Sequence, residues 1–288
     1  MTTADSRKKA RAVINRAAMI PLTAALMLST FTIPAAAQMT VLDQGYRQMY
    51  NLNFAAAHRA FADWEKTHPN DPMGAVSDAA AYLFAEFDRL HVLQSEFFTD
   101  DDRFLRRERK LSPDVVAKRH FEDALEHADR LASTVLAGAP EDENALLASV
   151  LRVGLQADYL SLIEKRNLAA LSEVKQSRII AQHLLTLYPE CYDAYLAVGV
   201  ENYLLSLKPL PVRWMLRVGG AHTDKRTGIE RLRITADKGH YLRPYARLLL
   251  AVAALRDKDT AAARRTLAWL ASEFPNNKLY QEELSKLK

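Results

Sequence analysis

SPDVVAKRHFEDALEHADRLASTVLAGAP, residues 112–140, decides the fold class. Its apolar residues recur every three or four positions, so they share one face of a helix. They are Phe121, Ala124, Leu125, Ala128, Leu131, Ala132, Val135 and Leu136. Ser112 as the N-cap residue, followed by Pro113, predicts the start of this helix, and Pro140 marks its stop. The stretch therefore predicts one long amphipathic helix.

Helix-stopping residues divide the rest of the chain in the same way. Pro69, Pro189 and Pro275 each follow an amphipathic segment, and Gly239 ends another. Sustained alternation of β-branched residues, the usual signal for a strand, is missing. Because each unit between stops has room for two helices, we expect an all-α fold of about five helical hairpins and a C-terminal closing helix. The hairpins span 39–69, 73–140, 142–189, 191–239 and 243–275, and the closing helix spans 277–287.

Two segments, 142–165 and 243–256, are apolar on more than one face. A helix that is apolar all round needs neighbours on several sides. We therefore expect these two segments to form central helices of the domain.

The first hairpin resembles the tetratricopeptide repeat (TPR) family. Gly45, Ala57, Phe61 and Pro69 stand at the spacing that this family uses. A further match follows Pro189 and consists of Tyr195, Val198 and Gly199. Another precedes Pro275 and consists of Ala263, Leu267 and Leu270, and a fainter one, Ala128, precedes Pro140. The resemblance implies a TPR-like α-solenoid, in which small Gly45 and Ala57 let two helices approach over Phe61.

The first 37 residues predict a signal peptide. Basic residues from Arg7 to Arg16 precede a mostly apolar stretch, Ala17 to Ile33, and small residues then lead to cleavage between Ala37 and Gln38. An uncleaved anchor helix is the alternative, but polar residues and prolines interrupt the apolar stretch. We therefore expect export to the periplasm and a mature TPR-like helical domain of residues 38–288, without an integral membrane span.

The charge of the mature chain argues against nucleic acid as a partner. The formal net charge is +4, and the five basic residues and one acid within residues 1–37 account for all of it. The mature chain is thus close to neutral. Its one cysteine, Cys191, allows no intrachain disulfide.

Candidate catalytic and metal sites are weak. The sequence lacks nucleophile-elbow, phosphate-loop and zinc-protease motifs, so we expect neither an enzyme nor a cofactor. His120, Asp123 and His127 could share one helical face as metal ligands, and Asp100, Asp101 and Asp102 could bind calcium, but both groups are more typical of solvated surfaces. Cys191 lacks a companion thiol or histidine, which argues against a nucleophile.

The TPR resemblance maps apolar residues to the concave face of the solenoid. They are Leu42, Tyr46, Met49, Tyr50, Leu196, Val200, Tyr203, Tyr245, Leu248 and Val252. Such a face either binds an apolar peptide or lipid-like ligand, or is buried as the protein's own core, which is the commoner outcome.

The stretch 208–220, with Trp214 between Arg213 and Arg217, interrupts the hairpins and is either an interaction patch or a packed connection.

These patterns predict an interaction module. The first hypothesis is a scaffold or accessory factor that binds a protein or peptide partner in the cell envelope. The alternative is a periplasmic binding protein for an apolar small molecule or peptide, which an enclosed apolar pocket would favour. The candidate binding residues are Tyr46, Tyr50, Tyr195, Tyr203, Trp214, Arg217 and Tyr245. The sequence leaves the oligomeric state and the identity of the partner open.

Overall fold

The computed structural model describes residues 39–94, 111–207 and 223–287, and this part of the chain is all-α. It contains eleven α-helices, one π-helix and one 3-10 helix, and no strand. The helices are α1 (Val41–Tyr50), α2 (Phe54–Thr67), α3 (Pro72–Arg89), α6 (Val115–Gly138), α7 (Glu143–Asp158), η1 (Tyr159–Ile163), α8 (Asn167–Leu187), η2 (Tyr192–Ala194), α9 (Tyr195–Ser206), α11 (Lys225–Lys238), α12 (Arg243–Arg256), α13 (Thr260–Glu273) and α14 (Lys278–Lys286). The all-α prediction is confirmed. The predicted signal peptide, Asp100 to Asp102, Trp214 and Arg217 lie outside the described residues.

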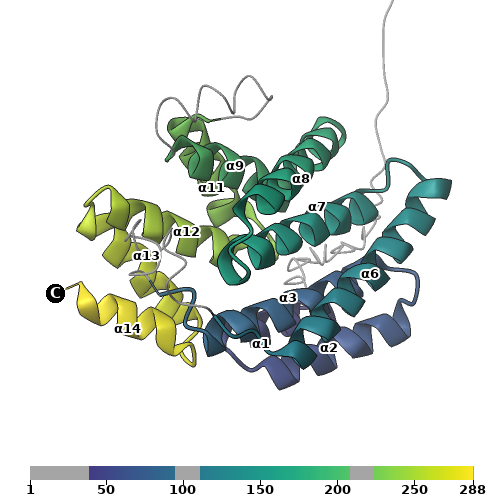
Figure 1. Ribbon diagram of the computed structural model, residues 1–288, viewed down its shortest axis with the longest axis horizontal. Coiled ribbons are helices and arrows are strands. Elements are labelled where there is room, and N and C mark those ends of the chain that lie inside the picture. The colour runs from purple at the N-terminus through teal and green to yellow at the C-terminus, as the bar shows by residue number, and fades with distance from the viewer. Residues whose placement is uncertain (1–38, 95–110, 208–222, 288) are drawn as a thin grey trace, which may run out of the picture. The chain divides into compact units, whose positions relative to one another are not determined.

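The helices pack in pairs that are adjacent in the sequence (Figure 1). The pairs are α1 with α2, α3 with α6, α7 with α8, α9 with α11, and α12 with α13, and α14 packs on α13. Each pair also contacts the next one through its second helix, as α2 contacts α3 and α8 contacts α9. The first pair precedes Pro69, and each later pair lies between two of the helix-stopping residues predicted from the sequence.

One turn recurs wherever a predicted proline stop follows a helix. After α2, the amide of His68 donates to the carbonyl of Trp64 (2.8 Å), and the amide of Asp71 donates to the carbonyl of His68 (3.0 Å). The same two bonds flank the other stops, where the donors are Ala139 and Asp142, Tyr188 and Cys191, and Phe274 and Asn277. Because proline lacks an amide hydrogen and cannot continue the helix, the chain turns at the same place each time.

A second turn recurs between the two helices of a pair. Its central residue has a positive φ: Leu52 (61°), His91 (54°), Lys165 (59°) and Lys258 (60°). In three of these turns the next amide donates to a carbonyl five residues earlier, which closes the helix end as a Schellman motif does. After η1 the partner of Arg166 is six residues earlier, at Leu160, because the π-helix adds a residue.

The start of α6 differs from the prediction. Asp114, not Ser112, is the N-cap residue, and its carboxylate accepts hydrogen bonds from the amides of Val116 (2.8 Å) and Ala117 (3.0 Å). Pro113 therefore precedes the cap and does not occupy the first helical position. The predicted stop at Pro140 holds, since α6 ends at Gly138.

Close packing within the first pair depends on Gly45. A Cβ atom at this position would lie 2.2 Å from Cε1 of Phe61, well inside van der Waals contact. Phe61 and Ala57 are fully buried between α1 and α2. These contacts are the ones that the TPR resemblance implies for this pair.

The two segments predicted as central helices are central. The helix α7 contacts α3, α6 and α8, and α12 contacts α11 and α13. Within the described residues, the continuous stretch Glu143–Ile163 alone is long and apolar enough to cross a membrane. Because 61% of its most apolar window is buried against neighbouring helices, it is typical of a core helix.

Contacts between α1 and the C-terminal helices bring the two ends of residues 39–287 together. Arg47 of α1 pairs with Glu273 of α13 (2.7 Å), and Asp43 of α1 pairs with His240 (2.7 Å). The amide side chain of Asn277 donates to the backbone carbonyl of Tyr50 (2.8 Å). The faces of α1 and α12 consequently border the same interior space.

Candidate ligand-binding cavity

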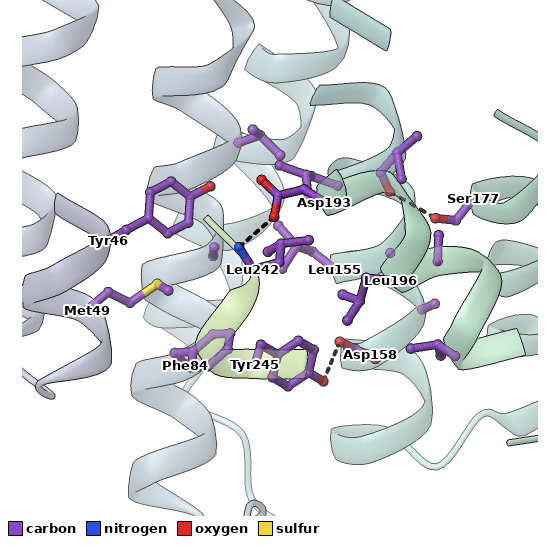
Figure 2. A pocket seen from close by; sticks show the side chains of 18 of the residues that line it. Tyr46, Met49, Phe84, Leu155, Asp158, Ser177, Asp193, Leu196, Leu242 and Tyr245 are labelled. Carbon is purple, nitrogen blue, oxygen red and sulfur yellow. Dashed lines mark hydrogen bonds between the residues drawn. The ribbon is translucent and has the colours of Figure 1, made fainter. Parts of the chain in front are cut away.

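A mostly apolar cavity lies between α1, α3, α7, α8, α9 and α12 (Figure 2). Its volume is about 70 Å³, measured as the space open to the centre of a water molecule. The lining residues are Tyr46, Met49, Tyr50, Val76, Ala80, Phe84, Val150, Leu151, Gly154, Leu155, Ala157, Asp158, Val174, Ser177, Asp193, Leu196, Ala197, Val200, Leu242 and Tyr245. An apolar wall with few polar groups is typical of a small-molecule site.

Three of the predicted binding residues, Tyr46, Tyr50 and Tyr245, meet at this cavity. The ring of Tyr50 packs edge-on against Phe84, with 5.6 Å between centroids, and Phe84 packs in the same way against Tyr245 (5.4 Å). Edge-to-face contacts of this kind fix the orientations of the rings. The aromatic side of the cavity is therefore a packed surface.

The other predicted residues lie elsewhere. The hydroxyl of Tyr195 donates to the carbonyl of Pro189 (3.2 Å) at an exposed position, and Arg231 lies over its ring. Tyr203 is buried in a separate cluster with Leu232 and Ala253. Trp214 and Arg217 are outside the described residues.

Most residues assigned to the concave face are buried. Leu42 and Met49 are each 1% exposed, and Leu248 is 3% exposed. Leu196 and Val200 keep partial exposure and line the cavity. The predicted apolar face is therefore largely core, with the cavity as the space that its side chains leave unfilled.

The tyrosine hydroxyls at the cavity are held by hydrogen bonds. The hydroxyl of Ser77 donates to that of Tyr46 (2.9 Å), and the hydroxyl of Tyr50 donates to the carbonyl of Tyr241 (3.1 Å). The hydroxyl of Tyr245 donates to Oδ2 of Asp158 (3.0 Å). Burial raises the pKa of Tyr46, Tyr50 and Tyr245 above the ordinary value, so these hydroxyls stay protonated.

Asp158 is an acidic group in this apolar wall, at the junction of α7 and η1. Burial raises the pKa of its carboxyl group to about 7, and the hydrogen bond from Tyr245 opposes part of that shift. The residue is half-buried and borders the cavity. π-Helical turns such as η1 occur often at functional sites.

Asp193 borders another part of the cavity and has a different environment. Its Oδ2 accepts a hydrogen bond from the amide of Tyr241 and its Oδ1 accepts one from the amide of Leu242, both at 3.0 Å. Burial raises the pKa of this carboxyl group, while the backbone donors and nearby His240 lower it. Asp193 thus fixes the segment that leads into α12.

The weaker candidate sites remain apart from the cavity. In the described part of the chain, no group of three or more His, Cys, Asp and Glu residues could hold a metal ion. His120 stacks on Tyr82 (5.4 Å between centroids), and His127 lies 3.9 Å from Glu65. Burial raises the pKa of the Cys191 thiol to about 12, which disfavours the nucleophilic thiolate.

Sequence reasoning missed Asp158, Asp193 and Phe84. A signal for Asp158 exists, because it is the single acid between Ala145 and Ile163 in a strongly apolar helix. An unpaired acid inside an apolar run is expensive to bury and so points to a specific environment. Asp193 and Phe84 carry no such signal, since their roles arise from contacts with distant residues.

No family model, curated protein or solved structure matches the chain.

Proposed function

We propose that this protein is an exported TPR-like α-solenoid that binds a ligand with an apolar surface in the cavity between α1, α3, α7, α8, α9 and α12. The leader-like residues 1–37 support export to the periplasm. The paired helices and the two recurring turns support a repeat architecture of about five hairpins with α14 as the closing helix.

The cavity is the observation that carries this proposal. A well-packed domain leaves few voids larger than a water molecule, and filling this one with a methyl-bearing side chain would gain stability. Gly154 of α7 borders the space, and a Cβ atom there would meet only Oγ of Ser177, at an ordinary 3.7 Å. The chain thus leaves the space open at a position where a larger side chain fits.

The scaffold hypothesis has less support. A contiguous exposed apolar patch would mark a surface that binds another protein. The exposed large apolar side chains of the described residues are Met39, Val41, Val115, Val116, Leu168, Ile179 and Leu204. They are distributed over several helices, while six of the ten residues that the TPR resemblance assigns to the concave face line the cavity.

The test is a titration of the mature protein with n-pentanol, a small neutral probe, followed by NMR. Wild type is expected to bind the probe saturably, with the largest chemical-shift changes at Leu155, Leu196 and Tyr245. Gly154→Leu places an isobutyl group in the cavity and is expected to abolish this binding.

Gly138→Leu is the matched control, because Gly138 ends α6 and a Cβ atom there meets nothing within 4 Å. This variant is expected to bind n-pentanol as wild type does. Absence of saturable binding to wild type, or equal binding to Gly154→Leu, would overturn the proposed function. Recovery of a stable protein complex that persists in Gly154→Leu would favour the scaffold.

A further inference from the structure

The polar groups of the cavity are the basis for assigning a ligand class. Asp158 uses Oδ2 to accept a hydrogen bond from Tyr245, and its Oδ1 accepts none from the described residues. Asp193 uses both oxygens for backbone amides. Among the bonds of the described residues, Asp158 is therefore the carboxylate that keeps an acceptor position beside the cavity.

The charged residues that the structure describes around the cavity have one sign. Asp158 and Asp193 both line it, and the described lining residues include no lysine, arginine or histidine. In an apolar environment such charges are weakly screened, so the site repels an anionic ligand and stabilises a cationic one. The aromatic rings of Tyr50, Phe84 and Tyr245 border the same space.

The size of the cavity limits the apolar part of the ligand. Its volume of about 70 Å³ is roughly half that of an apolar cavity of about 150 Å³ that holds benzene. A short unbranched chain suits this volume better than an aromatic ring or a lipid tail. Leu155, Leu196 and Leu242 supply the apolar surface that such a chain would contact (Figure 2).

We propose that the cavity binds a primary ammonium group on a short alkyl chain. The ammonium group donates a hydrogen bond to Oδ1 of Asp158, while Tyr245 holds the other carboxylate oxygen, and the chain lies against Leu155 and Leu196. This inference rests on the proposed function, since it names the ligand class of the same cavity. The ammonium group belongs either to a free alkylamine or to a lysine side chain of a protein partner.

The experiment compares three probes with one chain and different head groups: n-pentylammonium, n-pentanol and pentanoate. Calorimetric or NMR titration of wild type at pH 7.5 is expected to give at least about tenfold tighter binding for the ammonium than for the alcohol. Pentanoate is expected to bind most weakly, because it brings a third carboxylate to the site.

The variant Asp158→Asn keeps the shape of the side chain and removes its charge. It is expected to lose the preference for n-pentylammonium over n-pentanol. Asp123→Asn, at an exposed position on α6, is the matched control and is expected to keep that preference. Circular dichroism of both variants checks that helical content is unchanged.

The results of these titrations test the ligand class and the proposed function separately. Binding of n-pentanol or pentanoate as tightly as n-pentylammonium to wild type overturns the ligand class and leaves the cavity as an apolar site. Failure of all three probes overturns both proposals. If the ammonium is preferred, tighter binding of Nα-acetyllysine methylamide assigns the ligand to a lysine side chain, and weaker binding assigns it to a free amine.

Discussion

Single side chains set both the packing of the helices and the chemistry of the cavity. Gly45 is required because the ring of Phe61 occupies the space of its Cβ atom, whereas a Cβ atom at Gly154 would meet only Oγ of Ser177, at an ordinary 3.7 Å. Asp158 is held in an apolar wall, and burial raises the pKa of its carboxyl group to about 7. The two glycines therefore give opposite expectations for stability on substitution, and Asp158 gives an expectation that depends on pH.

Gly45→Ala is expected to lower the free energy of unfolding by about 1 to 3 kcal/mol, because the new methyl group collides with Phe61. Gly154→Ala is expected to raise it by about 0.5 to 1 kcal/mol, because alanine favours the helix and its methyl group fits. Urea denaturation of both variants measures the two changes. Stabilisation by Gly45→Ala would show that α1 and α2 are not in close contact at this position.

Asp158 makes stability depend on pH. Its folded pKa of about 7 lies above its ordinary value of 3.8, so between these values the folded protein keeps a proton that the unfolded chain loses. The free energy of unfolding therefore falls as pH rises through this window. The shift corresponds to at most about 4 kcal/mol, and the partial exposure of Asp158 reduces it to an expected loss on the order of 2 kcal/mol.

Asp158→Asn removes this contribution. Denaturation of wild type and Asp158→Asn at pH 4.5, 6 and 8 is expected to show that the variant gains stability relative to wild type as pH rises. Equal differences at the three pH values would mean that the carboxyl group titrates normally in the folded protein.

At the scale of the helices, two turns repeat with the same hydrogen bonds. The proline turns could be predicted from the sequence, because proline removes the donor that the next helical turn needs. The start of α6 was not predicted correctly, since Ser112 and Asp114 are both good caps and only the folded contacts decide between them. The π-helix η1 has no sequence signal in its residues Tyr159–Ile163, whose apolar pattern also suits an α-helix.

The turns within the pairs place non-glycine residues at positive φ. Lys258, between α12 and α13, has a φ of 60°, a conformation in which a side chain costs about 1 kcal/mol relative to glycine. Lys258→Gly is therefore expected to raise the melting temperature by a few degrees. Lys258→Ala serves as the control, because it shortens the side chain but keeps its Cβ atom, and it should give no such gain. Destabilisation by Lys258→Gly would contradict the assigned turn.

At the scale of residues 39–287 as a whole, the cavity depends on contacts between the two ends of this unit. Tyr46 and Tyr50 come from α1 and Tyr245 comes from α12, so their meeting needs the contacts of α1 with the C-terminal helices. The TPR resemblance placed these tyrosines on one concave face. Their meeting at one cavity, and the carboxylates beside them, could not be predicted because they depend on pairs such as Tyr245 and Asp158, 87 residues apart.

Asn277 is the residue that tests these end contacts. Its side chain donates to the carbonyl of Tyr50 (2.8 Å) and accepts from the amide of Leu279 at the start of α14 (3.1 Å). Asn277→Ala is expected to cost about 2 kcal/mol of unfolding free energy and to weaken n-pentanol binding. Asn276→Ala is the neighbouring control and should change neither, because the contact of Asn276 with Asn51 uses its backbone amide. Equal effects of the two substitutions would show that the end contacts do not support the cavity.

The most direct test of the central claim is a crystal structure of residues 39–288 soaked with n-pentanol. The account predicts ordered density for the probe against Leu155, Leu196 and Tyr245, with the Asp158 carboxylate still bonded to Tyr245. A cavity filled by its own side chains, with no density for the probe, would contradict the claim that this protein binds a ligand there.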